Sequence, residues 1–131
     1  MIDHEYEVYT ALKTAVQAKH PALECSSVEQ ATPPAFPCLA FEQYDNPIAM
    51  EKYDGSERFV APKFRITVFC DDNDKVLAKT ILADADEFMA SVGFIRTFGP
   101  QKVSTDLENV CKMISLYDGN LMDASGTIYR R

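Results

Sequence analysis

Long apolar runs are absent from this sequence, which excludes one large class of proteins. No stretch approaches the roughly 20 consecutive apolar residues that a membrane-spanning helix needs. The first ten residues, MIDHEYEVYT, are acidic and lack the basic and then apolar layout of a secretory signal. We therefore expect no membrane partner, and a protein that acts in the cytoplasm or in an assembly built there.

Catalytic and nucleotide-binding motifs are also missing. The chain has no GxGxxG, GxxxxGK, GxSxG or HExxH pattern. His4 and His20 are its two histidines, and neither has a Ser, Cys or carboxylate neighbour placed as in a nucleophile–base pair, so we expect them at surface or capping positions. The acidic run at 71–74 lacks the glycine and the distal glutamate of a calcium loop. The sequence thus predicts neither an enzyme nor a cofactor or metal site.

Cysteine is scarce and scattered. The four residues, Cys25, Cys38, Cys70 and Cys111, form no CxxC pair and lack the ligand spacing of a structural zinc site. Three of them lie in strand-like apolar runs, where an unpaired cysteine is usually a small packing residue. We therefore expect reduced thiols with mainly buried side chains.

Basic charge is in deficit. Lys and Arg number 13 against 20 Asp and Glu, which gives a formal net charge of -7. This balance argues against nucleic acid as a tight ligand, because duplex binding depends on neutralising phosphates.

The composition is that of a folded protein, with 47% hydrophobic and 25% charged residues among 131. Length and composition predict one globular domain over residues 1–131.

The first predicted element is a helix over residues 2–20. Five apolar or aromatic residues recur at steps of three and four and are predicted to share its buried face: Ile2, Tyr6, Tyr9, Leu12 and Val16. Asp3 is the predicted N-cap, and Pro21 is predicted to end the helix.

Three strands and a hairpin arm are predicted next. The strands are expected at 23–28, 38–44 and 62–71, with a proline-rich loop at 31–37. The third strand alternates between two sets of side chains: Phe64, Ile66, Val68 and Cys70 on one face, and Lys63, Arg65 and Thr67 on the other. The segment 47–60, with an Asp-Gly pair at 54–55, is predicted to form the arm.

The second half of the chain predicts a helix over 71–93, strands at 94–98 and 108–117, and a short final strand. Asp72 or Asn73 is expected to cap the helix and Gly93 to end it. Its apolar stripe is predicted to be Leu77, Ile81, Ala85, Phe88 and Val92, and its solvated face to hold Asp84, Asp86 and Glu87.

The order of elements indicates the fold class. It is predicted to be α+β, an antiparallel or mixed β-sheet with two helices packed on one face. The other face, with Lys63, Arg65 and Thr67, is then expected to be open to solvent or to a neighbour.

Two long segments resemble a known family. VAPKFRITVFCDDNDKVLAKTILADADEFMASVGFIRTFGP and LYDGNLMDASGTIYRR are similar to the tail terminator proteins, also called tail completion or minor capsid proteins, of long-tailed bacteriophages and prophages. The resemblance includes an N-terminal helix, a meander of strands, a helix ending in Gly93-Phe94, and the aromatic–basic ending Tyr129-Arg130-Arg131. It extends from about Ile2 to the end of the chain.

The resemblance implies a structural protein without catalytic residues. Members of this family are small α+β subunits that close into a hexameric ring, stop polymerisation of the tail tube protein and present a surface to the head connector or stopper protein. DNA passes through the lumen without specific binding, which a net charge of -7 suits. The implied location is the head-proximal end of the virion tail, after assembly in the cytoplasm of the bacterial host.

Contacts between subunits or with partner rings are expected at Tyr53, Lys63, Arg65, Tyr129, Arg130 and Arg131. The two terminal arginines are suited to bidentate pairing with carboxylates of a neighbour. A short edge strand with a solvated basic cap is the alternative interpretation of the tail. An ordinary loop is the alternative for the segment 47–60.

Two other functions remain open at this point. One is another head–tail joining component, such as a head-completion or stopper protein. The other is a small cytoplasmic module that binds a ligand or a protein in a groove between the helices and the sheet. The mass in solution bears on the module, which is expected to stay a monomer or dimer, but monomers alone do not exclude a terminator whose ring forms only on the tail.

The charge generates a first prediction. Binding to duplex DNA at physiological salt is expected to be weak or undetectable, because the net charge is -7 and the largest basic cluster is Arg130-Arg131. A gel-shift or filter-binding titration checks this expectation. Submicromolar, salt-sensitive binding would contradict the lumen interpretation and place the chain among nucleic-acid-binding proteins.

Overall fold

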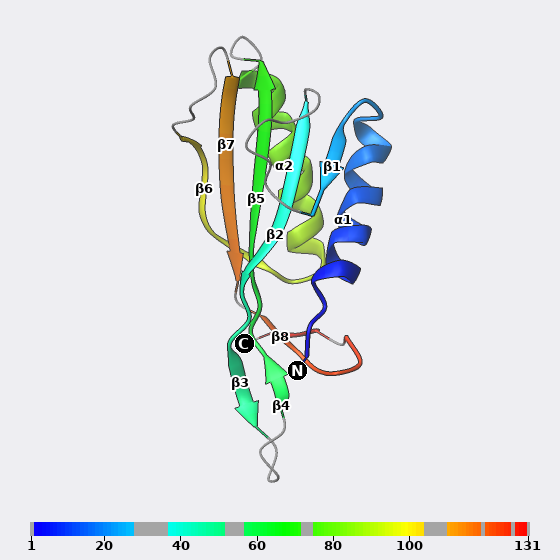
Figure 1. Cartoon of the computed structure of the whole chain (residues 1–131), viewed down its shortest axis with the longest axis vertical. Helices are drawn as coiled ribbons and strands as arrows, with labels where there is room; N and C mark the ends of the chain where they lie inside the picture. The colour runs from blue at the N-terminus through cyan, green and yellow to red at the C-terminus, as the bar shows by residue number, and fades with distance from the viewer. Residues whose placement is uncertain are drawn as a thin grey trace.

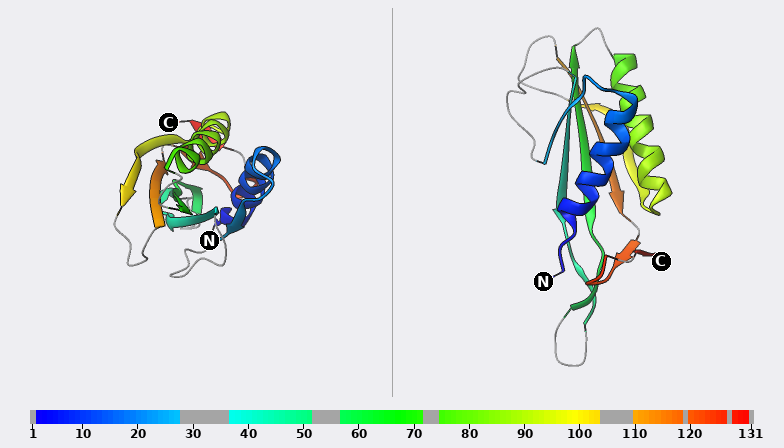
Figure 2. Two further views of the ribbon diagram at one scale, coloured as in Figure 1. Left: turned by 90° about the horizontal axis from the view of Figure 1, so that it is seen from above. Right: turned by 90° about the vertical axis from the view of Figure 1, so that its right-hand side faces the viewer.

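A computed structural model describes residues 2–27, 37–51, 57–71, 75–103, 110–118, 120–126 and 128–130. Its elements in chain order are α1 (Glu5–Lys19), β1 (Glu24–Ser26), β2 (Cys38–Asp45), β3 (Ile48–Glu51), β4 (Glu57–Val60), β5 (Lys63–Asp71), α2 (Lys75–Ser91), β6 (Ile95–Val103), β7 (Val110–Asp118), β8 (Asn120–Met122) and β9 (Ile128–Arg130). The predicted α+β class is confirmed, and Figure 2 shows both helices on one face of the main sheet.

The strands form two sheets. The main sheet has the order β1-β2-β5-β7-β6, and it is mixed because β1 pairs with β2 in parallel while the other pairs are antiparallel. The small sheet has the order β3-β4-β8-β9. Helices on one face leave a second sheet face that must be covered or solvated by other means.

One long hairpin connects the two sheets. β2 and β5 pair up to Asp45 and Lys63, and β3 and β4 continue the same two legs from Ile48 and Val60. Between them the amide of Ala61 donates to the carbonyl of Pro47 at 2.9 Å. Figure 1 shows this distal part extending beyond the main sheet along the long axis of the molecule. The predicted arm is therefore a strand pair, while the tip at 52–56, including Tyr53, lies outside the described residues.

α1 packs on the sheet through a line of side chains four residues apart. Val8, Leu12 and Val16 are buried, and the ring of Tyr9 stacks on Phe41 with 6.1 Å between centroids. Tyr6 was predicted on this face, but it is 75% exposed. It lies six positions before Leu12, and at 3.6 residues per turn this places it about 120° around the helix.

The start of α1 also differs from the prediction. His4, not Asp3, occupies the N-cap position, and its side chain makes no capping hydrogen bond. The Asp3 carboxylate instead accepts a hydrogen bond from the amide of Glu5 at 3.1 Å. One orphan amide of the first turn is thus satisfied from the residue before the cap.

α2 lies close to the sheet because its inner face carries small residues. Ala78 and Ala85 are fully buried, together with Ile81, Leu82 and Met89. The predicted Leu77, Phe88 and Val92 are only partly buried and pack at the margin of this face. The expected cap residues Asp72 and Asn73 lie outside the described residues.

The end of α2 is a Schellman turn. Gly93 has φ 94°, its amide donates to the carbonyl of Ala90 at 3.0 Å, and the amide of Phe94 donates to the carbonyl of Met89 at 2.9 Å. The positive φ favours glycine at this position. The turn points the ring of Phe94 at Phe64, with 5.1 Å between centroids and the rings perpendicular. The prediction that Gly93 ends the helix is confirmed.

The second face of the main sheet is less open than predicted. Thr67 is 1% exposed, and Phe69 is buried in a small cluster with Cys38 and Val110. Thr67 and Phe69 lie on the central strand β5, where neighbours on β2 and β7 flank each side chain. Burial at a central position therefore does not require a helix on that face.

Several strand boundaries depart from the predictions. β1 is shorter than 23–28, and β6 continues to Val103 although Pro100 lies within it. A proline is tolerated there because β6 is an edge strand with an irregular register around Phe98 and Gln101. Gly99, at φ 84°, fits this irregularity, since a Cβ there would overlap the carbonyl oxygen of Ile114. β8 was not predicted, and residues 31–36 of the expected proline-rich loop lie outside the described residues.

Core packing yields a prediction about stability. Ile66→Ala is expected to cost about 2–5 kcal/mol of unfolding free energy, because Ile66 is fully buried on β5. Leu77→Ala is expected to cost less, about 1–2 kcal/mol, because Leu77 is only partly buried. Urea unfolding measures both losses, and an Ile66→Ala loss no larger than that of Leu77→Ala would contradict this packing.

Candidate functional site

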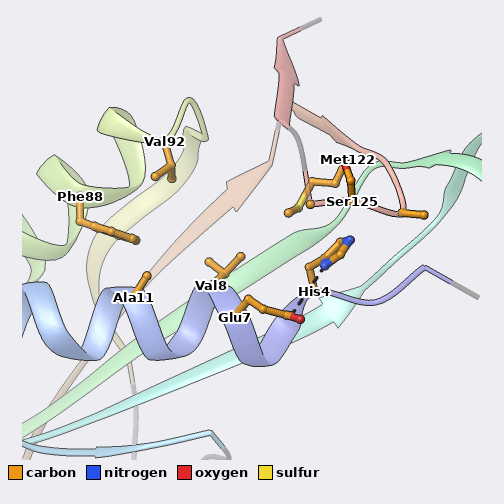
Figure 3. Close-up of a pocket in the computed structure, with 10 residues that line it drawn as sticks. His4, Glu7, Val8, Ala11, Phe88, Val92, Met122 and Ser125 are labelled. Carbon is orange, nitrogen blue, oxygen red and sulfur yellow. Dashed lines mark ion pairs between the residues drawn. The ribbon is translucent and has the colours of Figure 1, made fainter.

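A groove lies where α1, the end of α2 and the turn after β8 come together (Figure 3). Its volume is about 440 Å³, within the range of small-molecule pockets. It is lined by His4, Glu7, Val8, Ala11, Phe88, Val92, Met122, Ala124, Ser125 and Gly126. No sequence motif predicted this groove, and neither Lys63 nor Arg65 of the expected interface residues lines it.

Helical spacing builds two of its walls. His4, Glu7, Val8 and Ala11 follow one another at steps of three, one and three along α1, which places them on one side of the helix. Phe88 and Val92 are separated by one turn of α2, and the two side chains project into the groove beside Ala11 (Figure 3). This spacing is the sequence signal that could have identified the helical walls.

The third wall is a turn held by Asp123. Its carboxylate accepts hydrogen bonds from the amide of Ser125 at 2.9 Å and from the hydroxyl of Ser125 at 2.6 Å, while its carbonyl accepts from the amide of Gly126 at 3.1 Å. Gly126 has φ 85°, which favours glycine. Because this turn comes about 120 residues after α1 begins, sequence spacing gives no sign that the two meet.

His4 connects the turn to α1. Its Nε2 lies 2.7 Å from the carbonyl oxygen of Asp123. A carbonyl can only accept, so Nε2 carries the proton and donates. The other ring nitrogen, Nδ1, lies 3.7 Å from a carboxylate oxygen of Glu7, within reach of an ion pair when the ring is protonated. One end of the groove therefore holds an imidazole beside a carboxylate.

His20 makes the corresponding contact at the other end of α1. Its Nε2 lies 2.6 Å from a carboxylate oxygen of Asp84 on α2, and Lys19 lies 3.5 Å from the same carboxylate. Both histidines were predicted at surface or capping positions, and they occupy the N-cap and C-cap positions of α1. Their side chains are only 13% and 16% exposed, since each joins α1 to another element.

Two acidic residues predicted on a solvated face also have structural partners. Asp84 contacts His20, and Asp86 accepts a hydrogen bond from the hydroxyl of Tyr117 at 2.9 Å while lying 3.5 Å from Arg96. Burial and the hydrogen bond to Asp86 raise the pKa of Tyr117. These contacts place Asp84 at the interface between the two helices and Asp86 at the interface between α2 and the sheet.

The cysteines are free thiols. Cys38, Cys70 and Cys111 are buried as predicted, and Cys25 is half-buried. Burial raises the pKa of Cys25 to about 11, so its thiol is protonated at neutral pH. Among the residues that the structure describes, no three His, Cys, Asp or Glu side chains gather as metal ligands.

Among the expected interface residues, the structure describes Lys63 and Arg65 on β5 and the backbone of Tyr129 and Arg130 on β9. Arg65, half-buried, pairs with Glu42 across β5 and β2 at 2.6 Å, and Lys63 lies on the same strand. Tyr129 and Arg130 belong to β9, whose backbone pairs with β8. An ordered final strand is thus confirmed over Ile128–Arg130, while Arg131 lies outside the described residues.

Comparisons with known proteins leave the function to be argued from the molecule itself. No protein-family model matches the chain, and no curated protein matches it either. In the described part of the chain, neither helix combines the length and apolar character needed to cross a bilayer.

The cysteine thiols and tyrosine hydroxyls with raised pKa values predict how stability changes at alkaline pH. The pKa of Cys25 is raised from 9.0 to about 11, and burial also raises the pKa of Cys38, Tyr9 and Tyr117. The unfolded chain therefore loses these protons first, and stability falls as pH rises from about 9 toward the raised values. Melting temperatures between pH 8 and 11 measure the decline.

Substitutions test which ionisable side chains cause the loss of stability at alkaline pH. Tyr117→Phe is expected to reduce the slope above pH 9, because the ionisable hydroxyl beside Asp86 is removed. Tyr6→Phe is the matched control, since the Tyr6 ring is exposed and its replacement leaves the slope unchanged. A melting temperature that stays constant to pH 11 in the unaltered protein would contradict the prediction.

Proposed function

We propose that this chain is a structural subunit of a bacteriophage tail, which closes into a hexameric ring, ends polymerisation of the tail tube and joins the tail to the head connector. The observation that carries the proposal is β6, a long edge strand with exposed apolar side chains. The layout of the fold and the family resemblance of the sequence agree with the same role.

β6 offers a surface for pairing with another copy of the chain. It is nine residues long, and Ile95 is 61% and Phe98 40% exposed. Within the described residues, β7 pairs with one side of β6 and no strand pairs with the other. Proteins that stay monomeric usually keep their edge strands short, charged or covered. Arg96 and Lys102 supply some charge, but the exposed Ile and Phe favour association.

A second apolar surface lies at the base of the hairpin arm. Tyr44 at the end of β2 is 44% exposed, and Ile48 at the start of β3 is 48% exposed. Closed rings need heterologous contacts, in which a surface of one subunit meets a different surface of the next. β6 and the arm base are two different apolar surfaces on one subunit, which supports a ring rather than a two-fold dimer.

The charges of the molecule agree with a lumen for DNA. A net charge of -7 disfavours tight contacts with phosphates, so DNA would pass a ring of such subunits without being held. Tyr53, Lys63, Arg65, Tyr129, Arg130 and Arg131 remain the predicted contact residues of this proposal. Arg65 of this set pairs with Glu42 of its own chain.

The groove favours a second function, that of a small ligand-binding module. It lies between the helices and the turn after β8, and it is large enough for a small molecule. A module of this kind would work as a monomer or dimer, whereas the proposed ring subunit assembles on the tail tube. A head-completion or stopper protein would bind the connector and leave tube growth unchanged.

Assembly with the tail tube protein tests the proposal. The folded protein is expected to cap growing tubes at one end and to limit their length, as measured by electron microscopy. The double variant Ile95→Asp, Phe98→Asp is expected to need at least about ten times more protein for capping, because two charges in β6 oppose strand pairing.

A matched control is Val76→Asp. Val76 is also an exposed apolar residue, but it lies on α2 and not on β6, so capping is expected to be unchanged. Tubes that elongate freely at a molar excess of the unaltered protein would refute a tail terminator. Capping by the β6 double variant at the original concentration would show that β6 is not the assembly surface.

A further inference from the structure

We propose that the groove between α1, α2 and the turn after β8 binds a small organic amine, with its ammonium group at Glu7 and its apolar body against Phe88 and Val92. The proposal does not depend on the proposed function in tail assembly. It rests on the separation of polar and apolar groups along the groove and on the sign of the charge at its polar end.

The groove is polar at one end and apolar at the other. Figure 3 shows His4, Glu7 and Ser125 toward one end, and Phe88 and Val92 toward the other. Val8 and Met122 line the middle, and both are almost fully buried. An occupant that matches this lining has a polar head and an apolar body, because apolar walls gain from excluding water while polar groups need a partner.

The polar end offers a carboxylate acceptor to a ligand. The Nε2 proton of His4 is committed to the carbonyl of Asp123. The Glu7 carboxylate, 3.7 Å from Nδ1 of the same ring, is the acceptor at this end. The amides of Ser125 and Gly126 donate within their own turn. A head group that donates several hydrogen bonds fits this end.

Charge decides between a cation and a neutral donor. Among the described residues that line the groove, Glu7 alone has an Asp, Glu, Lys or Arg side chain, so this part of the lining carries negative charge. A primary ammonium has three donors and a positive charge, which match a carboxylate acceptor. Glu7 is 68% exposed, so the charge adds about two- to fivefold in affinity rather than more.

Titrations with three matched probes test the proposal on the purified, full-length protein. Phenethylamine, 2-phenylethanol and 3-phenylpropionate share a phenyl ring and differ in charge. Amide chemical shifts of the groove residues are expected to move with phenethylamine at the lowest concentration and with 3-phenylpropionate at the highest. Equal affinities for the amine and the alcohol, or preference for the carboxylate, would overturn the proposal.

Two variants distinguish the contribution of the ammonium group to affinity from that of the apolar body. Glu7→Gln is expected to weaken phenethylamine about two- to fivefold and to leave 2-phenylethanol unchanged. Ala11→Phe is expected to weaken both at least tenfold, because Ala11 is an exposed helix residue whose enlargement fills the groove. Glu87→Gln is the control, since Glu87 is an exposed carboxylate on α2 outside the groove.

The source of the amine is tested by a lysine side chain in a peptide. Acetyl-Phe-Lys-amide carries the same chemistry on a protein backbone. Binding of this peptide no tighter than phenethylamine supports a free amine as the ligand. Binding at least tenfold tighter would overturn the small-molecule proposal and make the groove a site for a basic protein segment.

Discussion

The stack of four aromatic rings through the core is the interaction on which the remaining structure depends. Tyr9 of α1 lies on Phe41 of β2, Phe41 lies 4.9 Å from Phe64 of β5, and Phe64 meets the edge of Phe94 after α2. Each contact joins a different element, so the stack fixes α1, the two central hairpin strands and the end of α2 relative to one another. Aromatic pairs of this geometry add about 0.5–1.5 kcal/mol each beyond their buried area.

The groove follows from where this stack places the two helices. α1 and α2 are held together at one end by His20, Lys19 and Asp84. At the other end α1 is instead held to the turn after β8, through His4 and Asp123. Small side chains such as Ala11 do not fill the space between these supports, and a groove remains. One end of the groove is polar because His4, which contacts the turn through Asp123, also lines the groove.

Local patterns in the sequence predicted the elements, whereas tertiary contacts decided what those elements expose. Alternation in β5 and the glycine at 93 predicted a strand and a helix end that the structure confirms. The prediction that Tyr6 is buried was wrong, because an apolar residue three or four positions from another can still lie outside a narrow buried stripe. The prediction that Thr67 is open to solvent or a neighbour was wrong, because a polar residue at the centre of a sheet is buried by its neighbours on adjacent strands.

The candidate site was harder to predict than the fold for a related reason. One wall comes from residues 122–126, and the wall that it contacts comes from residues 4–11, near the opposite end of the sequence. The contact between His4 and Asp123 spans 119 positions, so no local window contains both. Strand β6 was predicted over 94–98 but continues to Val103 through Pro100, because an irregular edge strand tolerates a proline.

The two surfaces proposed here place different demands on the molecule, and the fold keeps them apart. β6 forms one margin of the main sheet, and α1 lies toward the opposite margin, over β1 and β2 (Figure 1). Pairing at β6 would extend the sheet sideways without covering the wall of the groove that α1 supplies. Assembly through β6 and occupancy of the groove are therefore compatible, and a change at Ile95 or Phe98 need not alter the contacts of Glu7. The common element is α2, which leads into β6 and also supplies Phe88 and Val92. The turn at Gly93 adjoins both surfaces, and β7 also connects them, because it pairs with β6 and is followed by β8, whose Met122 lines the groove.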